Sequence, residues 1–318
     1  MNNLTHITRL SAVIVNWNSG AQLSAAVESF VRAADRADVD WCLTIVDNAS
    51  DDGSADCAMT QQGGRINMIV SPSNLGFGKA CNVGARSSAE KNGTPDFFLF
   101  LNPDTECNDD TLSQLFSEPI LSSPRHGVFG IRMTKGEQTS TTCSNFPSLL
   151  RMLGRSTGLA NILPPINALE HHMLSFDHHH DRDVDQVMGA FFLVRGELFE
   201  ALDGFDARFF MYYEEVDFCK RALAIGASCH YLSTPSIFHA RGGTTNSIRP
   251  QRLYYNLRSR LQYFSKHFGL LTTSIVAALA FTIEPFARVA RCLMRRDLLG
   301  CRDVLRAYAL FFFSSPKS

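Results

Sequence analysis

The stretch Phe97-Phe98-Leu99-Phe100-Leu101-Asn102-Pro103-Asp104 decides which fold class we predict. Its first five residues are all apolar, which is typical of a strand that is buried on both faces of a sheet. The strand ends in a polar loop that carries a carboxylate, Asp104. Because open parallel sheets bind ligands beyond the carboxyl ends of their strands, this loop is the first place where we expect a functional site.

The residues before this stretch alternate short apolar runs with amphipathic segments. Polar clusters begin at Asn16 and Asp47, directly after the first two runs, so they should lie at the same sheet edge as Asp104. The βαβ order predicts an α/β domain with a mainly parallel sheet flanked by helices. We predict strands at 10–15, 42–46, 66–70 and 97–101, and helices at 22–34, 78–89 and 110–115.

The rest of the chain is less regular. Residues 135–183 predict loops, because prolines and polar tracts interrupt them. Strand character returns at 187–194 and 229–232, with a helix at 216–224 between them. From residue 252 onward the pattern predicts helices.

Charge is balanced over the whole chain but not along it. The 30 Lys and Arg residues nearly cancel the 31 Asp and Glu residues, which argues against a general nucleic-acid binder. Residues 249–318, however, hold 12 basic and only three acidic residues. The nine cysteines contain no C-x-x-C pair, which favours a reducing compartment. The first residues also lack the pattern of a signal peptide.

Two segments at the predicted sheet edge suit a nucleotide. Asp47 can accept hydrogen bonds from a base or ribose, although a turn rich in Asp, Ser and Gly gives the same pattern. The segment Asn74-Leu75-Gly76-Phe77-Gly78-Lys79 opens a helix, where glycines and Lys79 favour an anion. Its glycine spacing does not fit a dinucleotide fingerprint, and the chain has no Walker A pattern. A Rossmann oxidoreductase and a P-loop NTPase are thus disfavoured.

Carboxylates mark two further places. Asp104 suits a divalent cation that bridges diphosphate oxygens, or it caps the helix predicted at 110. Glu214, Glu215 and Asp217 repel one another, so at least one should have a raised pKa or a cationic partner. Aromatic neighbours favour a general base in a partly desolvated pocket, while a surface helix start is the alternative.

Histidines give a weaker signal. An isolated His such as His239 is more often a hydrogen-bonding residue than a ligand. Five others look like a metal cluster but lack a defined ligand spacing, so we interpret them as a polar loop. They are His171, His172, His178, His179 and His180.

Together these blocks resemble the family 2 glycosyltransferases, which have the GT-A fold. The matching blocks run in order from Val13-Ile14-Val15-Asn16-Trp17-Asn18 to Phe238-His239-Ala240-Arg241-Gly242-Gly243, over about 240 residues. Between them stand IVDNASDDGS, NLGFGKACNVGA, FLNPDT, GAFFLVR and GFDARFFMYYEEVDFCKR. Within the family the chain is most similar to rhamnosyltransferases of cell-surface polysaccharide assembly, whose C-terminal region also resembles residues 253–260.

The resemblance implies roles for particular residues. Asn102 and Asp104 occupy the family's D-x-D motif, whose last acid binds Mg²⁺ or Mn²⁺. His239 matches a position that often completes the metal and diphosphate site, and Glu215 falls where these enzymes usually carry a catalytic Asp. The implied donor-binding residues are Val15, Asn16, Asp47, Asn74, Gly76, Lys79 and Asn102.

Two departures from the family pattern affect these roles. Asn102 replaces the first acid of the D-x-D motif, which should weaken metal binding without removing it. Glu215 adds one methylene to the usual Asp, so Asp217 or Glu214 could carry the catalytic role instead.

The activity implied by the resemblance is inverting, metal-dependent transfer of a sugar, with dTDP-rhamnose as the expected donor. The expected acceptor is a saccharide or polyprenyl-linked saccharide, and nucleic acid is not an expected partner. The alternatives are a UDP-sugar donor (galactofuranose, galactose or GlcNAc), or a catalytically weak protein that binds sugar nucleotides or glycans.

The basic end predicts contact with a membrane surface. The uncharged run at 268–283 spans about 24 Å as a helix, short of the ~30 Å hydrocarbon core. After it, Phe286 and Leu293 share one helical face while Arg288, Arg291 and Arg295 share another, which is typical of an interfacial helix on anionic lipid. Packing on the catalytic domain is the alternative. We therefore predict a catalytic domain at 1–248, a membrane-associating helical region at 249–318, and a cytoplasmic enzyme peripheral on the inner face of the cell membrane.

Overall fold

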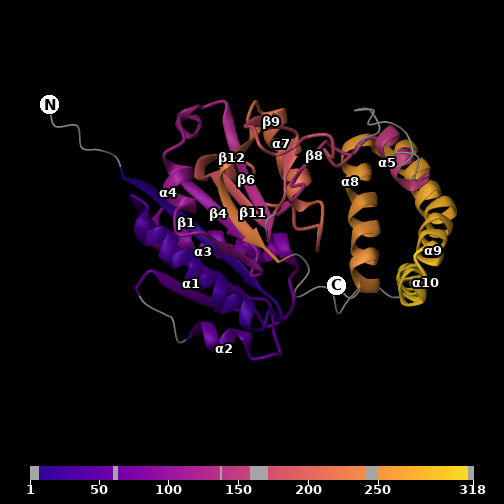
Figure 1. The fold of residues 1–318 in the computed structure, drawn as a ribbon, viewed down its shortest axis with the longest axis horizontal. Helices are drawn as coiled ribbons and strands as arrows, with labels where there is room; N and C mark the ends of the chain where they lie inside the picture. The colour runs from indigo at the N-terminus through magenta and orange to yellow at the C-terminus, as the bar shows by residue number, and fades with distance from the viewer. Residues whose placement is uncertain (1–6, 60–63, 137, 158–170, 241–248, 314–318) are drawn as a thin grey trace. The chain divides into compact units, whose positions relative to one another are not determined.

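The computed structural model describes residues 7–59, 64–136, 138–157, 171–240 and 249–313 (Figure 1). Contacts divide the chain into two compact units. The first unit comprises 1–144, 177–207 and 214–244, and the second comprises 145–176, 208–213 and 245–318. The division of the chain at residue 248 stays a prediction.

The first unit is an α/β domain. Its strands are β1 (Thr8–Asn16), β2 (Val39–Asp47), β3 (Ile66–Val70), β4 (Phe97–Leu101), β5 (Thr105–Cys107), β6 (His126–Lys135), β7 (Gln138–Thr139), β8 (Cys143–Ser144), β9 (Arg182–Val184), β10 (Gln186–Val187), β11 (Phe191–Arg195) and β12 (Ser228–His239). Its helices are α1 (Ala21–Arg36), α2 (Ser54–Met59), α3 (Phe77–Asn92), α4 (Thr111–Phe116), the 3₁₀ turn η1 (Pro119–Ser122), α6 (Gly196–Ala201) and α7 (Glu214–Ala224).

The central sheet has the order β3-β2-β1-β4-β11-β6-β12-β5. Strands β1 to β4 run parallel to one another, β11 runs against β4, and β6 and β12 again run parallel to β1. The carboxyl ends of β1, β2, β3, β4, β6 and β12 therefore meet at one edge. The predicted mainly parallel sheet flanked by helices is confirmed.

Helices cover both faces of this sheet, because alternate residues of β1 pack on different helices. Ile14 belongs to one apolar cluster with Val27 and Phe30 of α1. On the other face, a Cβ on Gly84 of α3 would lie 2.6 Å from Cγ1 of Val13, so only glycine lets α3 approach this closely. A strand that is buried on both faces has a continuous run of apolar residues, which is why β1 could be predicted from the sequence.

The less regular middle of the chain contains elements that the sequence did not predict. Strand β6 was missed because Gly127 and Gly130 break its apolar pattern; a Cβ on Gly130 would lie 2.6 Å from the side chain of Val187. The predicted strand at 187–194 is divided by a break into β10 and β11. Within 135–183, where we expected loops, lie β7, β8, β9 and the helix α5 (Leu149–Thr157).

The second unit is helical, as predicted for the end of the chain. Besides α5 it contains α8 (Arg249–Ala278), a π-helical turn η4 (Leu279–Ile283), α9 (Glu284–Met294) and α10 (Leu298–Phe313). Gly269 breaks the helical geometry inside α8, with φ 78°. Glu284 is buried between two cations, 2.7 Å from Nη2 of Arg260 and 2.6 Å from Nη2 of Arg288. Tyr308 of α10 donates a hydrogen bond to the carbonyl of Ala280, so α8, α9 and α10 share one core.

One helical stretch within the described ranges, Arg249–Met294, is long and apolar enough to cross a membrane by length and composition. Its most apolar window is only 17% buried. The uncharged run counted from the sequence is shorter than this stretch, because α8 continues through η4 into α9 without a loop. Length and composition alone are weak evidence for a span, since core helices of soluble proteins pass the same test.

Candidate active site

The carboxyl edge of the sheet gathers most of the predicted site residues. Asn16 and Asp47 end β1 and β2 as register partners. Asn102 follows β4, and His239 ends β12 beside Thr105. Parallel strand direction brings these residues to one edge although they lie far apart in the sequence.

Asn16 and Asp47 form the polar floor of this edge. The Asn16 amide donates to Oδ1 of Asp47 and to Oγ of Ser54, both at 2.8 Å. Asp47 also accepts the backbone N–H of Ser50 through Oδ2. Both side chains are buried, as is Val15. The network shapes the loop after β2, and the Asp47 carboxylate stays at the strand end where a nucleotide would lie.

The loop before α3 is organised by two asparagines. The Asn48 amide donates to Oδ1 of Asn74 at 2.9 Å, while Asn48 Oδ1 accepts the N–H of Leu75. Gly76 caps α3 with φ 81°, a left-handed conformation that favours glycine. Lys79 is exposed one turn into the helix. A cation and a helix N-terminus are thus presented together, as an anion site requires.

Asp104 and His239 are brought together at this edge. Both side chains are about 7% exposed, and Nε2 of His239 lies 3.3 Å from Oδ1 of Asp104. The Asp104 carbonyl accepts the N–H of Ala240, which fixes the two strands in this register. Asn102 is held by its backbone, which donates to the Ala190 carbonyl.

These residues fit a divalent cation. Nδ1 of His239 is buried and has no hydrogen-bond partner within the described part of the chain, so the imidazole has few protein contacts to lose on binding a ligand. A carboxylate and an imidazole leave most of an octahedral coordination shell to other oxygens. Such a pair suits a metal that is also bound by a diphosphate.

The three carboxylates that begin α7 have different surroundings. Glu214 is buried, and its Oε2 has no hydrogen-bond partner among the residues that the structure describes. Burial, and then the charge of Glu215, raise the pKa of Glu214 well above its usual value. These surroundings favour the protonated form of Glu214 more than water would.

Asp217 is fully buried in an ion pair. Nε of Arg221 donates to its Oδ2 at 2.7 Å, and the same guanidinium donates to the carbonyls of Leu202 and Gly204. Asp217 thus orients an arginine that closes the turn before residue 205. Its surroundings are those of a structural carboxylate.

Glu215 lies beside the break between β10 and β11. A Cβ on Gly189 would meet both Cβ of Glu215 and Cε1 of Phe77 at 3.8 Å. Glu215 is only partly buried as a residue, although its Oε2 is itself shielded from solvent. Sequence reasoning missed Gly189 and Phe77 as neighbours of Glu215, and no local pattern could have found a contact between three distant segments.

The N-terminal ends of α3 and α7 pack tightly. A Cβ on Gly78 would lie 3.1 Å from Cβ of Phe205 and 3.2 Å from Cβ of Glu214. Phe205 in turn packs on Phe218 of α7, with ring centroids 5.4 Å apart. The start of α3 and the acidic start of α7 therefore approach each other closely at one glycine, Gly78.

The segment just before α7, Arg208–Tyr213, belongs to the second unit. Tyr212 and Tyr213 have φ of 69° and 72°, a left-handed region that is costly for bulky residues. Ser259 donates a hydrogen bond to the carbonyl of Met211, and Nε of Arg252 donates to the Tyr212 hydroxyl. Helix α8 thus holds the strained turn that leads into Glu214.

One member of the histidine-rich loop has a structural role. His178 is buried, and its Nε2 accepts the backbone N–H groups of Thr142 and Cys143. Its carbonyl accepts the hydroxyl of Tyr231. These contacts hold the loop in place. They also occupy the lone pair on Nε2 of His178, which a metal would need.

Comparisons with known proteins show the family of this chain. The family model described as "Glycosyl transferase family 2" matches residues 11–170, half of the chain. A hexosyltransferase of low-salt glycan biosynthesis, Agl10 from Haloferax volcanii, is 28% identical over 69% of this chain and 62% of its own length. This chain therefore spans less than two thirds of that relative. An N-acetylglucosaminyl-diphospho-decaprenol L-rhamnosyltransferase from Mycobacterium tuberculosis is 26% identical over 74% of this chain and 77% of its own length.

The solved structures show the same fold. A mannosyltransferase from Pyrobaculum calidifontis, in complex with GDP-Man and Mn²⁺, matches 97% of this chain and 88% of its own with a TM-score of 0.58 at 13% identity. The first unit thus has the GT-A fold expected from the sequence. From the family match and the fold together, we conclude that this chain is a glycosyltransferase that belongs to glycosyl transferase family 2.

Proposed function

We propose that the chain is an inverting, metal-dependent transferase that moves rhamnose from dTDP-rhamnose to a lipid-linked saccharide in cell-surface polysaccharide synthesis. The observation that carries the proposal is that the buried side chains of Asp104 and His239 meet at the same sheet edge as Asp47. The mycobacterial relative, named as a rhamnosyltransferase, supports the choice of sugar.

The donor would lie along the carboxyl edge of the sheet. Val15, Asn16 and Asp47 would line the base and ribose, and the Asn74–Gly76 loop with Lys79 would face the phosphates. Asn102, Asp104 and His239 would hold the diphosphate and Mg²⁺ or Mn²⁺. When bound, the metal offsets the charge that develops on the departing nucleoside diphosphate.

Glu215 would be the general base. Its carboxylate takes the proton of an acceptor hydroxyl while that oxygen bonds to the anomeric carbon and the bond to the diphosphate breaks, with inversion. The surroundings of its neighbours support this choice, since Glu214 is buried with a raised pKa and Asp217 is paired with Arg221. Of the three acidic residues, Glu214 and Asp217 are buried and Glu215 is partly buried.

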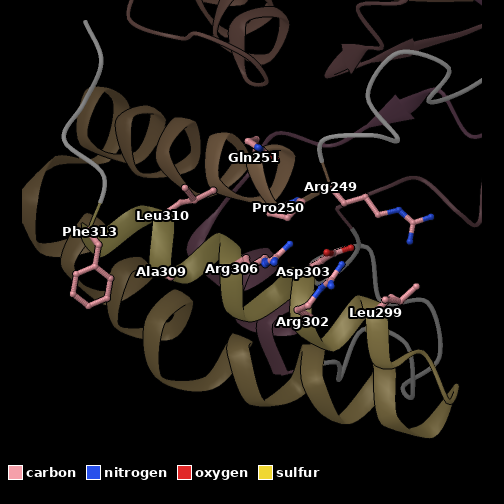
Figure 2. Close-up of a pocket in the computed structure, with 10 residues that line it drawn as sticks. All are labelled: Arg249, Pro250, Gln251, Leu299, Arg302, Asp303, Arg306, Ala309, Leu310 and Phe313. Carbon is pink, nitrogen blue, oxygen red and sulfur yellow. The ribbon is translucent and has the colours of Figure 1, made fainter.

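The second unit supports a lipid-linked acceptor and a membrane contact. A cavity of about 740 Å³ lies between the start of α8 and α10 (Figure 2). Arg249, Arg302 and Arg306 line it together with apolar Leu310 and Phe313. Arginines suit a phosphate and the apolar side chains suit a lipid chain. We propose that the phosphate end of the acceptor lipid binds here.

The outer face of the same helices supports peripheral binding to the inner face of the cell membrane. Phe286 and Leu293 of α9 are 75% and 55% exposed, on the helix face away from the Arg288–Glu284 pair. With 12 basic and three acidic residues in 249–318, an anionic lipid surface is the complementary partner.

A donor panel tests the proposed activity. Purified protein would be incubated with Mn²⁺ or Mg²⁺, a lipid-linked saccharide acceptor and either dTDP-rhamnose or the UDP-sugars of galactofuranose, galactose and GlcNAc. Release of dTDP with an inverted product bond is the expected result. Turnover with a UDP-sugar alone would overturn the donor assignment, and unchanged turnover after metal chelation would overturn the metal dependence.

A further inference from the structure

Two histidines and an aspartate lie together at the edge of the sheet opposite the proposed donor site. His126 begins β6 and His230 lies near the start of β12. These strands run parallel to β1, so their amino ends lie away from Asn16 and His239. Asp183 comes from β9, which pairs with β12 and places Asp183 opposite His230.

The three side chains point their ligand atoms at one position. Oδ1 of Asp183 is 2.9 Å from Nε2 of His126 and 2.6 Å from Nδ1 of His230. All three ligand atoms lie within 4.8 Å of one another. The side chains of His126 and His230 are 8% and 12% exposed, while that of Asp183 is 42% exposed.

We propose that His126, Asp183 and His230 form a zinc site that fastens β9 to the sheet. Two imidazoles and one carboxylate are a ligand set that Zn²⁺ prefers, with a fourth position left for water. Ligand atoms around a tetrahedral zinc are separated by roughly 3.3 Å. The Asp183 oxygen, at 2.9 and 2.6 Å from the two imidazole nitrogens, would therefore lie roughly 0.4 to 0.7 Å farther from them around the metal. Its partial exposure gives it that freedom.

Neighbouring groups orient this site as they do in zinc proteins. Oγ of Ser123 lies 3.0 Å from Nδ1 of His126, so it can accept a hydrogen bond from Nδ1–H, which leaves the lone pair of Nε2 for the metal. Nη2 of Arg125 is 3.3 Å from Oδ2 of Asp183, which keeps Oδ1 turned toward the histidines. Arg125 is 72% exposed, so water screens its charge from the metal.

The zinc would stabilise a short strand that has few other contacts. Strand β9 has three residues, and its backbone pairs only with β12 among the described strands. It leads through β10 to Gly189, which lies beside Glu215. A zinc ion bound by Asp183 would thus limit movement at the start of the segment 183–189, whose other end lies beside Glu215, the proposed base.

Zinc binding to full-length protein tests this proposal without any assay of sugar transfer. Metal-free protein would be titrated with Zn²⁺ in competition with a coloured chelator, and with Co²⁺ to record the intense visible absorption of tetrahedral coordination. Equimolar tight binding, with a rise in the thermal midpoint, is expected. Asp104→Asn should leave all three results unchanged, because Asp104 belongs to the other sheet edge.

The variants are chosen to separate this site from other histidines. His230→Ala and Asp183→Asn should weaken zinc binding at least tenfold and abolish the cobalt absorption. His180→Ala is the matched control, because His180 also pairs with an aspartate, at 3.2 Å from Asp177, but has no second histidine in that pair. It should bind zinc like the unchanged protein.

Ser123→Ala keeps all three ligands and provides a test if the ligand variants fail to fold. We expect it to weaken zinc binding about 10- to 100-fold, as loss of an orienting group does. The proposal is overturned if the unchanged protein binds no zinc, if His230→Ala and Ser123→Ala bind it normally, or if Asp104→Asn removes the binding. A failure of the donor panel would leave each of these results unaffected.

Discussion

Nε2 of His239 lies 3.3 Å from Oδ1 of Asp104, and both side chains are buried at the carboxyl edge of the sheet. His239 ends β12, and Asp104 directly precedes β5, which pairs with β12 although it lies far away in the sequence. Their closeness is the basis of the metal site that we propose.

The first prediction concerns these ligands. Asp104→Asn should weaken Mn²⁺-dependent binding of dTDP at least about tenfold, because a neutral amide is a poorer ligand than a carboxylate. Titration calorimetry with and without Mn²⁺ measures this. Asp183→Asn at the opposite sheet edge is the control. Equal dTDP affinity in Asp104→Asn and unchanged protein would contradict the assignment.

Glu215 carries the second prediction. Glu215→Gln should lower kcat by about 10²- to 10⁴-fold, the range expected for loss of a general base, with donor affinity within about twofold. Glu214→Gln is the matched control, because burial and the charge of Glu215 favour the protonated acid of Glu214, which the amide resembles. If Glu214→Gln loses as much activity as Glu215→Gln, the base is wrongly assigned.

The third prediction concerns the pH dependence of stability, to which Glu214 contributes. Its pKa is raised in the folded state, so the folded protein binds this proton more tightly than the unfolded chain does. The stabilisation is present below the unfolded pKa near 4.5 and is lost as pH rises toward the folded pKa, by up to about 1.4 kcal/mol per pH unit. Denaturant unfolding from pH 5 to 8 measures the free energy of unfolding at each pH, and this energy should fall less steeply with pH in Glu214→Gln than in the unchanged protein. The same slope in both proteins would contradict the prediction.

The sequence predicted the parts of the fold that depend on local patterns. Strands such as 97–101 are continuous apolar runs, and the helix at 216–224 has a clear period, so both were found. Strand β6 was not, because Gly127 and Gly130 are explained only by the side chains that fill the space beside them. For the same reason, the proximity of His126 to His230 and of Gly189 to Glu215 could not be read from residue order.

Helix α8 gives a fourth prediction. Ser259 is buried and donates to the Met211 carbonyl just before the two left-handed tyrosines. Ser259→Ala removes this bond and should cost about 1 kcal/mol of stability, and it should lower kcat more than it changes donor affinity. Ser265→Ala on the same helix is exposed and should change neither quantity. Equal kinetics for both variants would show that α8 does not position this turn.

Membrane contact is the fifth prediction. In a flotation assay, the protein should rise with vesicles that contain anionic lipid. With vesicles of neutral lipid alone, it should remain unbound in the bottom fraction. Reversing the exposed charges Arg291→Glu and Arg295→Glu together should abolish flotation. Reversing Arg86→Glu and Lys135→Glu changes the net charge equally on the first unit and should leave flotation intact. Loss of flotation in both double variants would mean that net charge alone governs it.

The close packing at Gly78 has a consequence for how this enzyme can diverge. A Cβ at residue 78 would lie 3.1 Å from Cβ of Phe205 and 3.2 Å from Cβ of Glu214, so a substitution there makes the start of α7 or the turn before it shift slightly. The loop before α3 and the acidic start of α7 are therefore coupled through this glycine. If the loop selects the nucleotide sugar and the helix activates the acceptor, as we propose, selection on one acts on the other.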